Sequence, residues 1–236
     1  KLEKNKFWFA QGDGHLFGWY KAHSTDLDVE IKDPNVWVSQ IQGPKSLELL
    51  NKIIDKPFKG NFKYFDWEEV SIASEIVIVS RTGFTNELGW EIYISPDNDA
   101  RKIGDLLLEE GEKMGMLLTA SPGFRGRRIE AGLLSAGRDF TKDRNPFSVG
   151  LGKFIDFDKG DFIGRDFLLN ADKKCLTWGM RVENSFALVD SDILLDGKKI
   201  GIVTSSTWSP YQECGVSIVH LNGSNFGPGT IVDVLC

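Results

Sequence analysis

The stretch RTGFTNELGWEIYI, residues 81–94, follows one short apolar run of the chain and ends in another. The run 76–80 is rich in β-branched residues, and the run 91–94 has the same character. Two such runs around a short polar segment predict a β-hairpin. The connection carries Gly83 and Gly89, which we expect to shape the turn.

Side chains alternate between the two faces of a strand, and this places the polar groups of the second strand. Trp90, Ile92 and Ile94 are expected on one face, and Glu91 and Tyr93 on the other. A carboxylate beside an aromatic ring can bind the donor-rich edge of a flat heterocycle while the ring stacks on it. The alternative, which is common for alternating strands, is a solvated face with no ligand.

Helical patterns flank the predicted hairpin. Apolar residues recur with helical spacing over 43–54, with Pro44 near the expected first turn. The cluster DND at 97–99 is typical of an N-cap and predicts a second helix that ends near 111–115. A short strand, a Gly-Asp-Gly turn and an aromatic-rich helix are expected over 6–22. This order indicates an α+β fold with mixed or antiparallel sheets.

The pattern changes after Cys175. Short β-like segments are separated by turn signals, among them Asp196-Gly197 and Pro228-Gly229. We therefore expect a small β-barrel or sandwich domain at the C-terminus.

Composition limits the classes of partner. The chain has 236 residues, 41% of them hydrophobic, which is enough for a substantial core. Its formal net charge of −6 lacks the broad positive field that attracts nucleic acid or anionic membranes. Its apolar stretches are much shorter than the roughly 20 residues of a membrane span. We therefore expect neither nucleic acid nor a membrane as a partner.

Cysteine and histidine usage gives two further expectations. Cys175, Cys214 and Cys236 are widely separated and form no CxxC pair, which suits a reducing compartment and predicts a cytoplasmic protein. The histidines do not cluster with them, so we expect no metal site. The chain also lacks a GxGxxG motif, a Walker loop and a GxSxG elbow, so phosphate cradling and covalent acyl chemistry are not expected.

Two other segments carry candidate groups. Arg125, Arg127 and Arg128 in GFRGRRIEAG (123–132) could bind a ligand carboxylate, but a solvated helix start with an internal Arg–Glu pair is the more common arrangement. Trp208 in SSTWSP could cover a pocket, although core or domain-interface packing is more usual for such a residue.

Five segments, in matching order and spacing, resemble the glycine-cleavage T-protein family of folate-dependent enzymes over almost the whole chain. They are QIQGPKSLELL (40–50), RTGFTNELGWEIYI (81–94), RRIEAGLLSAGRDF (127–140), NPFSVGLGKFIDFDKGDFIGRDFL (145–168) and GIVTSSTWSP (201–210). Within the family, the sequence of these segments is similar to that of the dimethylsulfoniopropionate demethylase branch. Phe124 supports this, because aminomethyltransferases typically carry an arginine at that position.

The resemblance implies a three-domain fold with tetrahydrofolate in a central channel and a C-terminal β-barrel. We expect residues 1–32 to be the remnant of a middle α+β domain and 33–130 the α+β folate-binding domain. Residues 131–168 would return to the middle domain, and 169–236 would form the barrel. The family's acidic residue that faces the reacting nitrogen lies upstream of the part matched here. We therefore expect an N-terminally truncated member whose catalytic residue would precede Lys1.

The resemblance also implies the site and the reaction. Glu91 would hold the amino and ring N–H edge of the pterin with Tyr93 beside it, and Arg81 and Trp208 would be further cofactor-binding residues. The implied chemistry is methyl transfer from a sulfonium, dimethylsulfoniopropionate or a similar small molecule, to N5 of tetrahydrofolate. Aminomethyl transfer, another folate-dependent demethylation and a non-catalytic folate-binding scaffold stay open as alternatives. The methyl donor, the oligomeric state and the group that meets the folate tail beside Phe124 are not determined by the sequence.

Overall fold

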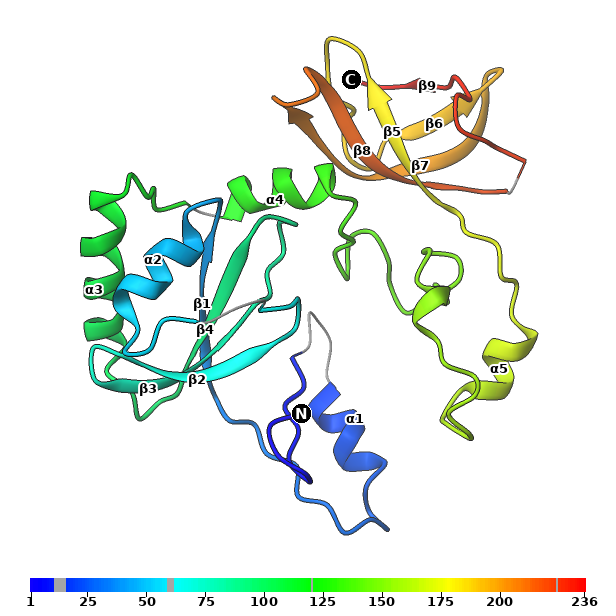
Figure 1. Cartoon of the computed structure of the whole chain (residues 1–236). Helices are drawn as coiled ribbons and strands as arrows, with labels where there is room; N and C mark the ends of the chain where they lie inside the picture. The colour runs from blue at the N-terminus through cyan, green and yellow to red at the C-terminus, as the bar shows by residue number, and fades with distance from the viewer. Residues whose placement is uncertain (11–15, 59–61, 120, 224) are drawn as a thin grey trace. The chain divides into compact units, whose positions relative to one another are not determined.

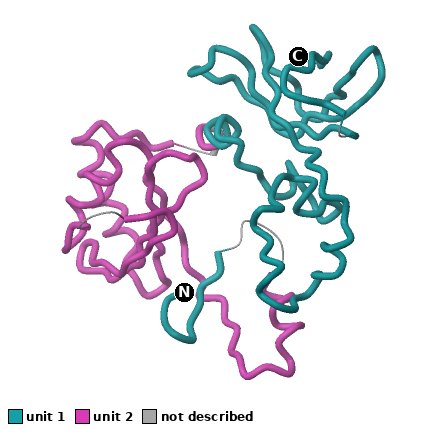
Figure 2. The backbone as a smooth tube through the Cα atoms, turned by 45° about the vertical axis from the view of Figure 1, so that its right-hand side comes forward, with its two compact units in different colours: residues 1–13, 125–236 teal, residues 14–124 magenta. Residues whose placement is uncertain are grey.

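A computed structural model describes residues 1–10, 16–58, 62–119, 121–223 and 225–236. The chain divides into two compact units, which are coloured separately in Figure 2. The first-sheet unit comprises Gly14–Phe124. The C-terminal unit comprises Lys1–Asp13 together with Arg125–Cys236. The predicted division into four segments stays a prediction.

The first-sheet unit is built on a four-stranded antiparallel sheet of order β1-β4-β3-β2 (Figure 1). The strands are β1 (Trp37–Gln42), β2 (Trp67–Ile72), β3 (Glu75–Ser80) and β4 (Gly89–Ile94). The ladder between β3 and β4 confirms the predicted hairpin. The second neighbour of β4 is β1, a strand far away in the sequence, and this pairing makes β4 a central strand.

Two amphipathic helices of this unit, α2 (Ser46–Ile53) and α3 (Ala100–Lys113), match the predicted helical patterns. The side chain of Asp99 accepts a hydrogen bond from the backbone N–H of Lys102 at 3.2 Å, which confirms the predicted N-cap. A third helix, α1 (Leu16–Ala22), lies within the segment predicted as strand, turn and helix.

The strand of that same prediction is wrong, because residues 7–10 belong to no strand of the described chain. A strand exists only through its ladder with a neighbour, so an apolar local pattern is not sufficient. The predicted Gly-Asp-Gly turn lies outside the described residues.

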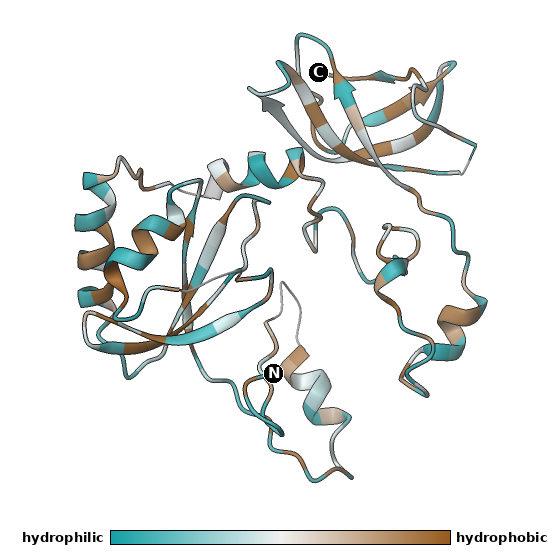
Figure 3. Cartoon of the chain, in the orientation of Figure 1, coloured by the Kyte–Doolittle hydropathy of each residue, from teal (hydrophilic) through white to brown (hydrophobic). Residues whose placement is uncertain are grey.

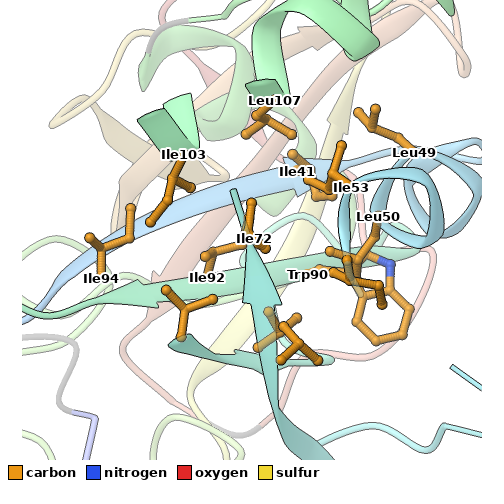
Figure 4. Close-up of a cluster of buried hydrophobic side chains, with 14 residues drawn as sticks. Ile41, Leu49, Leu50, Ile53, Ile72, Trp90, Ile92, Ile94, Ile103 and Leu107 are labelled. Atoms are coloured by element: carbon orange, nitrogen blue, oxygen red, sulfur yellow. The ribbon is translucent and has the colours of Figure 1, made fainter. Parts of the chain in front are cut away.

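Both α2 and α3 pack on the same face of the sheet (Figure 4). Trp90 and Ile92 of β4 are 1% and 0% exposed, and they share one cluster with Leu50 of α2 and Ile103 of α3. Figure 3 shows apolar and polar residues alternating around both helices, as this one-sided packing requires. Burial of each large side chain contributes roughly 1.5–3 kcal/mol, so this face decides the register of β4.

The connection between β3 and β4 needs its glycines for space. Neither Gly83 nor Gly89 has a positive φ; the left-handed residue of the connection is Asn86, at 59°. A Cβ on Gly89 would lie 2.2 Å from Oε1 of Gln42, and a Cβ on Gly83 would lie 2.6 Å from its Nε2. The expectation that the glycines bend the turn is therefore corrected: they leave room for the side chain of Gln42, which reaches across from β1.

Five strands form the antiparallel sheet of the C-terminal unit, in the order β5-β8-β7-β6-β9. They are β5 (Thr177–Val182), β6 (Asp192–Leu195), β7 (Lys198–Ser209), β8 (Cys214–Leu221) and β9 (Asp233–Val234). Asp196 and Gly197 have φ of 50° and 73°, as a two-residue hairpin turn between β6 and β7 requires.

The predicted C-terminal β-barrel is not confirmed. A barrel requires hydrogen bonding between its first and last strands, and in the part of the chain that the structure describes no ladder joins β5 to β9. Because β9 has only two residues and pairs only with β6 there, the sheet has two ends.

Helical segments precede this sheet in the sequence: α4 (Ser121–Glu130), the 3₁₀ turn η1 (Gly152–Phe154) and α5 (Arg165–Asn170). Over the described ranges of the chain, none of the helices has the length and apolar character that crossing a membrane requires.

Replacing Gly89 by alanine should destabilise the protein by about 1–2 kcal/mol, since the new Cβ displaces Gln42 and breaks its bond with Thr85. Urea denaturation measures this change. Gly104→Ala in α3 is the control: its Cβ would meet nothing within 4 Å, and we expect it to stabilise by about 0.4–1 kcal/mol. Equal stability of Gly89→Ala and wild type would contradict the account of the connection.

Candidate functional site

The face of β4 that points away from α2 and α3 carries Glu91 and Tyr93, as the alternation predicts. Both residues are half-buried, whereas a fully solvated strand face would leave them exposed. The site is therefore built from the residues that surround them on this second face of the sheet, called the Glu91 face.

Strand register fixes the neighbours of Glu91. Gln40 of β1 lies opposite it on one side, and Ser80 of β3 on the other. Opposed residues have Cβ atoms about 4.5–5.5 Å apart, so these side chains can touch. A parallel row next to it contains Val38, Tyr93 and Ile78. The Glu91 face thus has a polar row beside an apolar and aromatic row.

Three donors from different parts of the sheet hold the Glu91 carboxylate. Nε2 of Gln40 donates to Oε1 at 2.8 Å. The hydroxyl of Tyr93 donates to Oε2 at 3.1 Å, and the hydroxyl of Thr82 donates to the same oxygen in a short hydrogen bond. A carboxylate held in this way keeps its orientation without the side-chain entropy cost of being ordered by a ligand.

The hydroxyls around Oε2 form a directed chain. The hydroxyl of Thr82 donates its proton to Glu91. In the hydrogen bond between Ser80 and Thr82, whose hydroxyl oxygens are 2.5 Å apart, Ser80 must therefore be the donor. Burial raises the pKa of the Tyr93 phenol above its ordinary value of 10.0, and the negative charge of Glu91 raises it further. Tyr93 therefore stays protonated and donates throughout the neutral range.

This arrangement can bind a flat, donor-rich molecule. An oriented carboxylate accepts hydrogen bonds from ring or amino N–H groups, and the neighbouring aromatic and aliphatic row offers apolar area to the face of a ring. All of these groups belong to the first-sheet unit.

The remaining predicted site residues, Arg81 and Trp208, are not among the three donors to Glu91. Arg81 follows β3, and its Nη1 donates to the backbone oxygen of Phe62 at 2.6 Å, so that guanidinium already holds a neighbouring loop. Trp208 belongs to β7 of the C-terminal unit, where it is 41% exposed. Their roles in cofactor binding stay predictions.

Two arginines of α4, Arg127 and Arg128, have internal partners. Arg127 forms an ion pair with Glu130, as the more common alternative predicted. Arg128 is 4% exposed and pairs at 2.6 Å with Asp139, which is fully buried. Arg128 therefore fits neither predicted alternative, a solvated helix start or a contact with a ligand carboxylate. Its guanidinium is buried in the C-terminal unit and pairs with Asp139.

Asp139 is a structural centre of the C-terminal unit that sequence reasoning missed. Its carboxylate accepts hydrogen bonds from Thr204 at 2.7 Å and from Ser205 at 2.6 Å on β7, and from the backbone N–H of Ser135 at 2.8 Å. These bonds, with the charge of Arg128, hold the pKa of Asp139 below its ordinary value although burial alone would raise it. Arg128 and Asp139 both lie in the segment 127–140, and their opposite charges were the available signal for a buried ion pair.

Comparison with known proteins gives a consistent pattern. Residues 1–159 match the family described as GCVT N-terminal domain. An aminomethyltransferase of Caldanaerobacter subterraneus is 33% identical over 93% of this chain and 60% of its own length. A dimethylsulfoniopropionate demethylase of Ruegeria pomeroyi is 27% identical over 99% of this chain and 65% of its own.

A solved structure also resembles this chain. The glycine cleavage system aminomethyltransferase T from Bartonella henselae matches with a TM-score of 0.73 at 21% identity, over 87% of this chain and 57% of that one. This likeness concerns the fold. The chain spans 57–65% of the length of these three proteins.

Asp139→Asn should destabilise the protein by about 3–5 kcal/mol near neutral pH, because it leaves the Arg128 guanidinium buried without a counter-charge. The pH dependence has a definite sign: the folded pKa of Asp139 is depressed, so its stabilisation is present above the ordinary value of 3.8 and is lost as pH falls through the folded pKa. The variant should lack this part of the acid dependence.

Urea denaturation at several pH values measures both effects. Asp190→Asn removes the exposed pair with Arg138 and is the matched control, with an expected change of about 0–1 kcal/mol. Similar losses in the two variants would show that burial does not matter at Asp139.

Proposed function

Because the chain belongs to the glycine-cleavage T-protein family, we propose that it forms part of a tetrahydrofolate-dependent group-transfer enzyme. Aminomethyltransferases of this family use tetrahydrofolate as a cofactor or substrate. The chain covers 60% of the length of the aminomethyltransferase from Caldanaerobacter subterraneus, so the activity of the complete protein is part of the proposal.

The folate would bind on the Glu91 face. The single observation that carries this assignment is the Glu91 carboxylate, half-buried and oriented by Gln40, Thr82 and Tyr93. A pterin presents a ring N–H and an amino group on one edge, and this donor set suits an ionised carboxylate. The aromatic ring of Tyr93 offers a contact to the flat ligand. Arg81 and Trp208 are carried into the proposal as further cofactor-binding residues.

The proposed reaction is transfer of a methyl group from a small sulfonium, dimethylsulfoniopropionate or a similar donor, to N5 of tetrahydrofolate. The carbon–sulfur bond breaks, its electron pair stays on sulfur as a neutral thioether, and N5 forms the new bond and loses its proton. A sulfonium is a good leaving group, so the protein mainly has to align the two reactants and exclude water. The similarity to the Ruegeria pomeroyi demethylase over 99% of this chain and the phenylalanine at position 124 support this donor.

Aminomethyl transfer is the second candidate, because the aminomethyltransferase from Caldanaerobacter subterraneus shares 33% identity. Both versions of the proposal assign no catalytic residue within the chain. The proposal also places the protein in the cytoplasm, supported by three cysteines that are all free thiols.

Glu91→Gln should weaken binding of tetrahydrofolate about five- to tenfold, because a charge-assisted contact worth about 1.5–3 kcal/mol becomes a neutral one worth about 0.5–1.5 kcal/mol. Isothermal titration calorimetry measures the affinities. Glu68→Gln is the matched control and should bind like wild type, since Glu68 is an exposed carboxylate on the edge strand β2 whose register with Val79 places it on the opposite face of the same sheet. Equal binding by wild type and Glu91→Gln would contradict the assignment of the folate to the Glu91 face.

Incubation with tetrahydrofolate and each candidate donor should yield 5-methyltetrahydrofolate from the sulfonium. Chromatography of the folate products separates this outcome from 5,10-methylenetetrahydrofolate, which an aminomethyl donor would give. If only the aminomethyl donor reacts, aminomethyl transfer replaces methyl transfer from a sulfonium as the proposed reaction. Folate binding without any product would favour a non-catalytic folate-binding protein.

A further inference from the structure

Gln40 lies on the edge strand β1, directly opposite Glu91. Its side chain is exposed, and its Nε2 donates to Oε1 of Glu91 at 2.8 Å. A contact made by an exposed glutamine contributes little to the stability of the fold. Because Gln40 lies on the candidate binding face, we consider whether it contacts the ligand.

The oxygens of Glu91 differ in how many donors they already hold. Oε2 accepts from the hydroxyls of Thr82 and Tyr93, which fills the two lone-pair positions of that oxygen. Oε1 accepts from Gln40 alone among the described residues, and it keeps one position for another donor. Glu91 therefore offers a ligand one free acceptor position, on Oε1.

A second free acceptor stands next to it. The amide oxygen of Gln40 receives no hydrogen bond from the residues that the structure describes. It is bonded to the same carbon as Nε2, which contacts Glu91, so the amide oxygen and Oε1 of Glu91 are close neighbours. The orientation of the amide is also determined, because the reverse orientation would turn its oxygen toward the negative carboxylate.

We propose that Gln40 is a second ligand-reading residue, which accepts from one donor of a two-donor edge while Oε1 of Glu91 accepts from the other. This inference rests on the proposed function and sharpens it: the pterin edge is shared between two strands, and Gln40 selects ligands that carry the exocyclic amino group. A neutral amide suits this role, because a second carboxylate beside Glu91 would add charge repulsion.

The test compares two ligands in calorimetric titrations of the whole chain. The ligands are tetrahydrofolate and the analogue in which hydrogen replaces the 2-amino group. Gln40→Met keeps the length of the side chain and removes both polar atoms. It should weaken tetrahydrofolate about three- to tenfold and the deamino analogue less than about twofold. Gln212→Met makes the same chemical change at an exposed position of the C-terminal unit and should leave both affinities unchanged.

Each other outcome rejects a defined statement. An unchanged affinity of Gln40→Met for tetrahydrofolate overturns the role of Gln40. An equal loss for both ligands also overturns it, since Gln40 would then only orient Glu91. If wild type binds neither ligand, the proposed function itself fails, and this inference fails with it. Circular dichroism of Gln40→Met distinguishes a lost contact from a lost fold; should that variant unfold, Gln40→Leu takes its place with the same expected outcomes.

Discussion

Strand β4 packs Trp90, Ile92 and Ile94 against the two helices of its unit, and the pleat of the strand then directs Glu91 and Tyr93 to the other face. A slip of the ladder by one residue would bury a carboxylate among aliphatic side chains and expose the tryptophan, at a cost of several kcal/mol. The position of the candidate site follows from this burial. The core of the first-sheet unit thus determines where its polar chemistry is displayed.

The connection before β4 supports the same arrangement from its side. Gln42 fills the space that Cβ atoms of Gly83 and Gly89 would occupy, and it accepts a hydrogen bond from Thr85 at 2.7 Å. The connection is held close to β1 as a result. Thr82, at its start, is then in reach of Glu91. Gln42 and Thr82, which do not contact the ligand in our proposal, therefore help to orient the Glu91 carboxylate, which does contact it.

In the C-terminal unit the charges serve the fold. The ion pair between Arg128 and Asp139 is almost completely buried, and three further donors satisfy the carboxylate. Such a pair is tolerated only when its hydrogen bonds are complete, because removal of charges from water costs several kcal/mol per ion. Arg127 and Arg128, which the sequence offers as candidates for binding an anionic ligand, thus have partners within the folded C-terminal unit.

Local order in the sequence was sufficient to predict the hairpin, the N-cap at Asp99, the two amphipathic helices and the face on which Glu91 lies. Each depends on residues a few positions apart, through the periods of strand and helix and through turn chemistry. The partners of the site could not be read in this way. Gln40 meets Glu91 across 51 positions, and Ser205 meets Asp139 across 66. Such meetings depend on which strands pair and which faces are buried, and packing of the whole unit decides both, since no local pattern encodes the neighbour of a strand.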